Sequence, residues 1–198
     1  ETTVLRARAF KDGIEPTNID TNTYIFTSSV KRQPDDPVGY PERWEQGQSA
    51  DYEMDPDVVD DPAYKDEIEV ALKDIPSISV VSDPDNLFGR DGLYLNVTRR
   101  PQQGEGADFN YEYGVSAEFL FADGEALQID CGLRSQGGAS RNPGSSPKHA
   151  MSLRFRNAYG AGKLAFPLLK DSPQTAFNSI QLRARYNNTW HHSNSAQQ

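Results

Sequence analysis

The segment from Cys131 to Arg156, CGLRSQGGASRNPGSSPKHAMSLRFR, decides the fold that the sequence predicts. Residues 127–134 (LQIDCGLR) and 150–157 (AMSLRFRN), at its two ends, alternate apolar and polar side chains as half-buried strands do. Alternation places the residues of the second strand on two opposite faces, with Met151, Leu153 and Phe155 on one and Arg154 and Arg156 on the other. The segment is therefore a basic, glycine-rich strand–loop–strand suited to holding an anion.

Similar strand patterns recur along most of the chain, so we predict an α+β fold dominated by strands. The turn signals Lys11-Asp12-Gly13 and Asp123-Gly124 predict two hairpins. Pro62–Leu72 is the one convincing helix, with Asp61 as its N-cap. Asp83-Pro84-Asp85-Asn86 predicts a turn. The remaining expected strands are residues 3–10, 21–27, 77–82, 93–96, 115–121 and 177–185.

Composition changes along the chain predict three parts. Residues 1–28 resemble the end of a β-sandwich, residues 29–62 a linker or wrapping loop, and residues 63–198 the N-terminal part of a further domain. The chain begins without Met inside a strand pattern, and its last strand ends near Gln198. We therefore expect a piece of a longer protein.

Charge is distributed unevenly along the chain. The net charge is −9, yet from Cys131 onward nine basic residues face one acidic residue, Asp171, a balance of +8 that leaves −17 on residues 1–130. Such separation favours anions at the basic part. No apolar run is long enough to span a membrane, and we expect no nucleic-acid partner.

The loop between the two strands carries the candidate anion ligands. Gly137 and Gly138 let the backbone approach a ligand and expose its N–H groups, while Arg141 and Lys148 add positive charge. Arg154 and Arg156 follow on the next strand, and arginine suits bidentate contact with phosphate. The spacing matches neither a Walker A motif nor a protein-kinase glycine loop. An exposed loop with a solubilising basic face is the equally weighted alternative.

Other candidate sites have simpler explanations. Cys131 is a small buried residue rather than a catalytic thiol. The acidic cluster between Asp51 and Asp61 does not have EF-hand spacing, so helix capping explains it better than a metal. His191 and His192 point apart on a strand, which disfavours a metal there. No G-x-S-x-G elbow supports a serine hydrolase.

Three motifs, read together over residues 50–190, resemble the spore-coat-protein-H (CotH) kinase family of atypical, secreted protein kinases. They are IPSISVVSD with NLF at residues 75–83 and 86–88, GLRSQGGASR at residues 132–141, and PKHAMSLRFR at residues 147–156. Residues 180–184 (IQLRA) with Trp190 continue the pattern. The opening residues 4–10 (VLRARAF) through Tyr24 are similar to the end of the β-sandwich found at hexosaminidase C-termini.

The resemblance implies a secreted or surface protein that transfers phosphate from ATP, with magnesium, to Ser or Thr of a surface or coat protein. It makes Lys148 the lysine that meets nucleotide phosphates, with Arg134 and Arg141 assisting and Gly137-Gly138 as a flexible cover. The catalytic and metal-binding acids would lie beyond Gln198, so this part alone would be inactive.

The competing class is a non-catalytic extracellular module that binds polysaccharide or an acidic partner. Exposed aromatic residues would then stack on sugars, although packing of the long loops onto the core explains them better: Tyr40, Trp44, Tyr111 and Tyr113.

Overall fold

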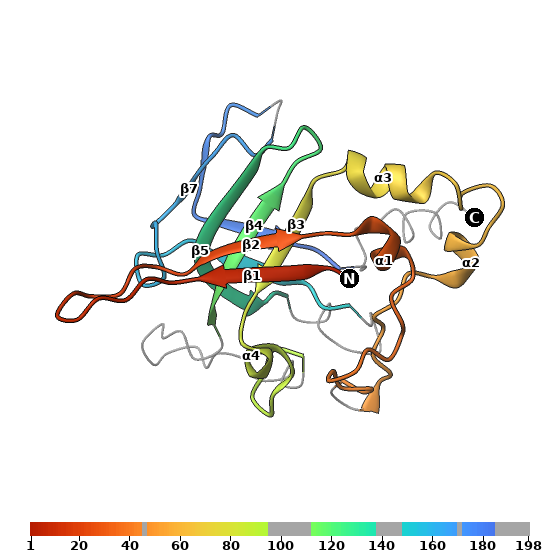
Figure 1. Cartoon of the computed structure of the whole chain (residues 1–198), viewed down its shortest axis with the longest axis horizontal. Helices are drawn as coiled ribbons and strands as arrows, with labels where there is room; N and C mark the ends of the chain where they lie inside the picture. The colour runs from red at the N-terminus through yellow and green to blue at the C-terminus, as the bar shows by residue number, and fades with distance from the viewer. Residues whose placement is uncertain (45–46, 95–111, 138–147, 170–171, 185–198) are drawn as a thin grey trace. The chain divides into compact units, whose positions relative to one another are not determined.

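The computed structural model describes residues 1–44, 47–94, 112–137, 148–169 and 172–184. It has the predicted class, a mixed α+β fold in which strands dominate (Figure 1). The main sheet has the strand order β3-β4-β5-β6-β9, and two smaller sheets pair β1 with β2 and β7 with β8. The strands are β1 Thr3–Ala7, β2 Asp20–Tyr24, β3 Ser77–Val81, β4 Tyr113–Leu120, β5 Ala126–Ser135, β6 Met151–Arg154, β7 Leu164–Ala165, β8 Ala176–Phe177 and β9 Ser179–Leu182.

The chain divides into two compact units, each built from discontinuous segments. Unit 1 comprises residues 1–37, 52–81 and 116–129, and unit 2 comprises residues 38–51, 82–115 and 130–198. Strands β4 and β5 contribute residues to both. The domain boundaries expected at residues 28 and 62 stay a prediction.

Both predicted hairpin turns are confirmed. Gly13 has φ 75 and Gly124 has φ 87, left-handed values that favour glycine. At the second turn, Asp123 Oδ1 accepts a hydrogen bond from the backbone N–H of Glu125 at 3.0 Å. The turn then closes through the N–H of Phe121, which donates to the carbonyl of Glu125. Strand β4 thus returns as its hydrogen-bonded neighbour β5.

The described helices are short: α1 Thr27–Lys31, α2 Pro56–Val59, α3 Ile68–Asp74 and α4 Pro84–Phe88. The helix expected at residues 62–72 begins only at Ile68. Asp61 does accept a hydrogen bond from the N–H of Ala63, as an N-cap would, but a series of turns follows before the helix. The carbonyl of Tyr64 accepts from both Glu67 and Ile68, so the regular helical ladder starts late.

Aspartate–proline pairs begin two further helices: Asp55 has the capping role expected of the acidic cluster, whereas Asp83 begins a helix where a turn was expected. Asp55 and Asp83 each accept a hydrogen bond from the N–H two residues on, and Pro56 and Pro84 occupy the first helical turn. Residues 83–86 therefore open α4 rather than form an isolated turn.

Two strand predictions, for residues 93–96 and 177–185, were wrong in part. Leu93 and Tyr94 form a turn because their N–H groups donate to the carbonyls of Asn86 and Leu87 in α4, which leaves none for a strand partner. The strand expected over residues 177–185 is split into β8 and β9 at Asn178, whose carbonyl accepts from Phe155.

In unit 1 the buried carboxylate of Glu118 connects the β1–β2 hairpin to the main sheet by hydrogen bonds. Glu118 on β4 is 4% exposed and accepts from both the backbone N–H (3.1 Å) and the hydroxyl of Thr23 on β2. Thr23 Oγ1 also lies 2.7 Å from Ser79 Oγ on β3. Because the Thr23 hydroxyl donates to Glu118, it accepts from Ser79, and the donors run from Ser79 through Thr23 to Glu118. The hairpin is thereby bound to the sheet by charge-assisted hydrogen bonds.

We predict that Thr23→Val lowers the free energy of unfolding by about 1.5–3 kcal/mol, because a buried carboxylate loses a donor while side-chain shape is kept. Urea denaturation measures the change. Thr3→Val is the matched control, since Thr3 is an exposed residue of the paired strand, and its effect should stay within about 0.5 kcal/mol. Equal effects of the two variants would contradict this role of Thr23.

Candidate functional site

Strand register brings arginines of three strands to one face of unit 2. Arg134 on β5 lies opposite Ser152 on β6, and Ser152 lies opposite Gln181 on β9. Two residues after Ser152 on β6, Arg154 lies opposite Gly132 on β5 and Ser179 on β9. Directly opposed residues share a face, and so do residues two apart on a strand. We call this surface the basic face: Arg134, Ser152, Arg154, Gln181 and Arg183.

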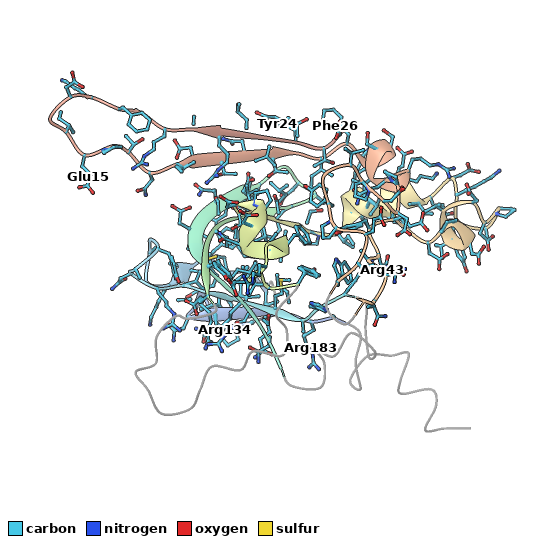
Figure 2. All side chains as sticks on the ribbon, turned by 90° about the horizontal axis from the view of Figure 1, so that it is seen from below. Glu15, Tyr24, Phe26, Arg43, Arg134 and Arg183 are labelled. Carbon is cyan, nitrogen blue, oxygen red and sulfur yellow. The ribbon has the colours of Figure 1, made fainter. Side chains whose placement is uncertain are left out.

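Arg183 joins this face one residue after β9 ends. Figure 2 shows the Arg134 and Arg183 side chains on the same side of the ribbon. Arg183 is exposed, while Arg134 and Arg154 are half-buried. Within the described parts of the chain, none of these three guanidiniums forms an ion pair or a hydrogen bond. Arg134 and Arg154 lie one same-face step apart on neighbouring strands, and Arg183 joins the face just after β9. The Glu112 carboxylate also lies on this face, because it occupies the space over Gly132 opposite Arg154, and it is paired with Arg156.

The opposite face of the same strands is the core of unit 2. Leu133 and Leu153 are directly paired and are 1% and 0% exposed. Met151 and Phe155 flank Leu153 on this face, as the alternation predicted, and both are buried. This packing fixes the strand backbones, so it also fixes the spacing of the arginines that point the other way.

Arg156 forms an ion pair with the buried carboxylate of Glu112. Its Nε lies 2.9 Å from Glu112 Oε1, and its Nη2 lies 3.4 Å from Glu112 Oε2. The Glu112 side chain is 3% exposed and that of Arg156 is 38% exposed. The guanidinium therefore holds a carboxylate that would otherwise be buried without a counter-charge. The predicted phosphate-ligand role of Arg156 is untested, but most of its charge is offset by Glu112.

Gly132 makes room for this ion pair. A Cβ atom there would lie 2.4 Å from Glu112 Oε1 and 2.7 Å from Tyr159 Cε2, too close for either group to stay in place. The Tyr159 hydroxyl in turn lies 3.4 Å from the Glu112 carbonyl oxygen. Burial raises the pKa of Tyr159, and the nearby negative charge of Glu112 raises it further.

Lys148 lies just before β6, at the end of that strand away from Arg154. Its Nζ is 3.8 Å from Asp51 Oδ1, and its side chain is 61% exposed. The neighbouring residue His149 is buried and stacks on Tyr94, with ring centroids 4.7 Å apart and planes 21° apart. This stacking anchors the backbone from which the Lys148 side chain extends.

The glycine-rich loop is described only at its start. Gly137 has φ 90, so the chain leaves β5 through a conformation that glycine favours. Gly138 and Arg141, the other loop residues expected to contact an anion, lie outside the described residues, as do Asp171, Tyr111, Trp190, His191 and His192.

The aromatic residues considered for sugar stacking are engaged in packing. Trp44 is 4% exposed, and its ring centroid lies 4.9 Å from that of Tyr94 and 5.6 Å from that of His149. Tyr40 is 50% exposed and meets Phe88 edge-on at 5.4 Å. The Tyr113 hydroxyl donates to the carbonyl of Asp91. Packing of loops onto the core, the favoured explanation of these residues, is confirmed for Trp44.

Cys131 is an unreactive core residue, as predicted. It is 0% exposed, and burial, with smaller effects from Asp130 and Glu112, raises its pKa to about 12. Among the residues that the structure describes there is no group of three or more metal-ligating side chains, and no helix is long and apolar enough to cross a membrane.

Comparison with known proteins adds no assignment: the chain matches no protein-family model, no curated protein and no solved structure.

The sequence pattern placed Arg154 correctly on the polar face of β6 but missed three residues of the site. The same alternation of side chains places Ser152 on that face, so the sequence pattern of this strand was sufficient to identify it. Arg183 reaches it only through the β6–β9 pairing. Glu112 is 44 positions from Arg156, so no local pattern links them.

We predict that Arg156→Ala lowers the free energy of unfolding by about 2–3 kcal/mol, below the full cost of breaking a buried pair because Arg156 is partly exposed. Arg183→Ala removes the same charge from an exposed position and should change stability by less than about 0.5 kcal/mol. Urea denaturation of both variants compares them. If the two losses are equal, the ion pair with Glu112 does not stabilise the unit.

The raised pKa of Cys131 predicts alkaline sensitivity. The unfolded thiol ionises near its ordinary pKa, whereas the folded thiol stays neutral up to about 12. This group therefore favours the folded state at neutral pH, and that contribution falls as pH rises from about 8.5 towards 12. Cys131→Ala should lose less stability than the unmodified chain between pH 8 and pH 11, measured by denaturation at each pH. Rapid labelling of the native thiol at pH 8 would contradict the assignment.

Proposed function

We propose that the basic face of unit 2 binds the phosphates of a nucleotide, as part of a protein that transfers phosphate from ATP to Ser or Thr of a surface or coat protein. Magnesium would accompany the nucleotide, and the protein would act outside the cell. The proposal joins the resemblance to CotH kinases with one observation: strand pairing places Arg134 and Arg154 on one face, Arg183 joins it just after β9, and none of the three has an ion-pair partner in the described chain.

The alignment supports an anion in two ways. Arg134 and Arg154 are diagonal neighbours on adjacent strands, about 7–8 Å apart at their backbones, so their charges repel until an anion offsets them. Arginine also presents its donors in a planar fork that matches phosphate oxygens. Lys148, at the other end of β6, would supply a mobile charge to the same ligand, and Arg141 with Gly137-Gly138 would close over it.

An acidic protein partner would use the same charges, and it is the competing occupant. It differs in that it needs no nucleotide, so a small-molecule titration separates the two. Sugar stacking receives less support, because Trp44 is buried.

The test is calorimetric titration of the 198-residue chain with ATP, Mg-ATP and adenosine. We predict that ATP binds, that adenosine does not, and that Arg134→Ala and Arg183→Ala each weaken binding about tenfold, the effect of losing one charge-assisted contact. Lys148→Ala should weaken it similarly.

Arg6→Ala is the matched control, since Arg6 is an exposed strand arginine of unit 1 and its removal changes net charge equally. It should leave the affinity for ATP unchanged. Absence of ATP binding by the unmodified chain, or an equal loss in Arg6→Ala, would overturn the proposal in favour of a non-nucleotide partner or of nonspecific charge attraction.

A further inference from the structure

We propose that Ser152 and Arg154 form a specific anchor for one phosphoryl group at the centre of the basic face. This inference rests on the proposed function and deepens it, because it names the group that the face recognises and the two side chains that grip it.

Ser152 has the central register position of the face. It lies on the middle strand β6, between Arg134 on β5 and Gln181 on β9, and it is 1% exposed. Arg154 follows two residues later on the same face. Its directly opposed neighbours on this face are the long side chains of Arg134 and Gln181, whose rotation would give a ligand access to it.

Two buried polar atoms at this point have no partner. Ser152 Oγ and Arg154 Nε are inaccessible to solvent, and neither makes a hydrogen bond within the described chain. Buried polar groups are nearly always paired in native proteins, and an exception indicates an ion, a water or a functional role. Two such atoms on consecutive same-face positions of one strand indicate a shared missing partner.

The chemistry of these atoms defines that partner. Arg154 Nε only donates, and Ser152 Oγ can donate, so the partner is an acceptor. The described carboxylate on this face, that of Glu112 over Gly132, is already paired with Arg156, and Arg134 and Arg154 flank Ser152, so the remaining charge disfavours a cation. A phosphoryl group brings three strong acceptor oxygens. They match three donors from two adjacent strands, namely the Ser152 hydroxyl, Arg154 Nε and the guanidinium of Arg134. A carboxylate presents its acceptor sites from two oxygens in one plane, which suits donors from two strands less well than three oxygens arranged around phosphorus.

The anchor predicts opposite effects of one substitution on stability and on binding. Ser152→Ala removes a buried hydroxyl that has no partner in the ligand-free protein, so its melting temperature should stay equal or rise. The same change should weaken inorganic phosphate and ATP about fivefold to tenfold. Arg154→Lys keeps the charge but loses Nε and the fork, and it should weaken both ligands at least tenfold.

Ser135→Ala is the matched control, because Ser135 lies on β5 with the opposite parity, in register with the core residue Met151. Its affinity for phosphate should equal that of the unmodified chain. Acetate, titrated alongside phosphate, tests the class of anion and should bind at least tenfold more weakly.

Several results would overturn the anchor. A lowered melting temperature in Ser152→Ala with unchanged phosphate affinity would identify a bound water as the partner. Equal binding of acetate and phosphate would remove the phosphoryl assignment. If ATP binding depends on Arg134 and Arg183 but not on Ser152 or on the Arg154 fork, the anchor fails while the proposed function stands. If no ligand binds to the unmodified chain, both fail.

Discussion

Strand β6 has a hydrogen-bonded neighbour on each side, and the site depends on that double pairing. Leu153 is completely buried against Leu133, so β6 cannot slide by one residue without turning this leucine to the polar face. The same constraint fixes Ser152 and Arg154 opposite their partners on β5 and β9. Core packing on one side of the sheet thus determines the charge pattern on the other.

The arginines of this region divide into two kinds once their surroundings are known. Arg156 is occupied with Glu112, a buried carboxylate that needs a counter-charge, and so it serves the fold. Arg134, Arg154 and Arg183 serve no described carboxylate. Net charge along the sequence cannot separate these roles, because it counts all four residues alike.

Sequence reasoning succeeded where the structural signal is local. Strands β4, β5 and β6 follow from alternation, and the Asp123-Gly124 turn follows from residues that tolerate its geometry. It failed where local signals compete: Asp61 caps only a series of turns before α3, and Asp83 begins α4 where a turn was expected. It also failed for long-range partners, since neither the Glu112–Arg156 pair nor the fastening of Thr23 to Glu118 has a local pattern.

Because Gly132 has no side chain, Glu112 can lie beside it and pair with Arg156, so these three positions depend on one another. With any side chain at residue 132, the carboxylate of Glu112 could not remain beside the strand, and Arg156 would lose the charge that holds it. Relatives of this protein should therefore keep glycine, glutamate and arginine at these positions together or replace them together. A relative with only one of the three changed would have had to rebuild the start of β4.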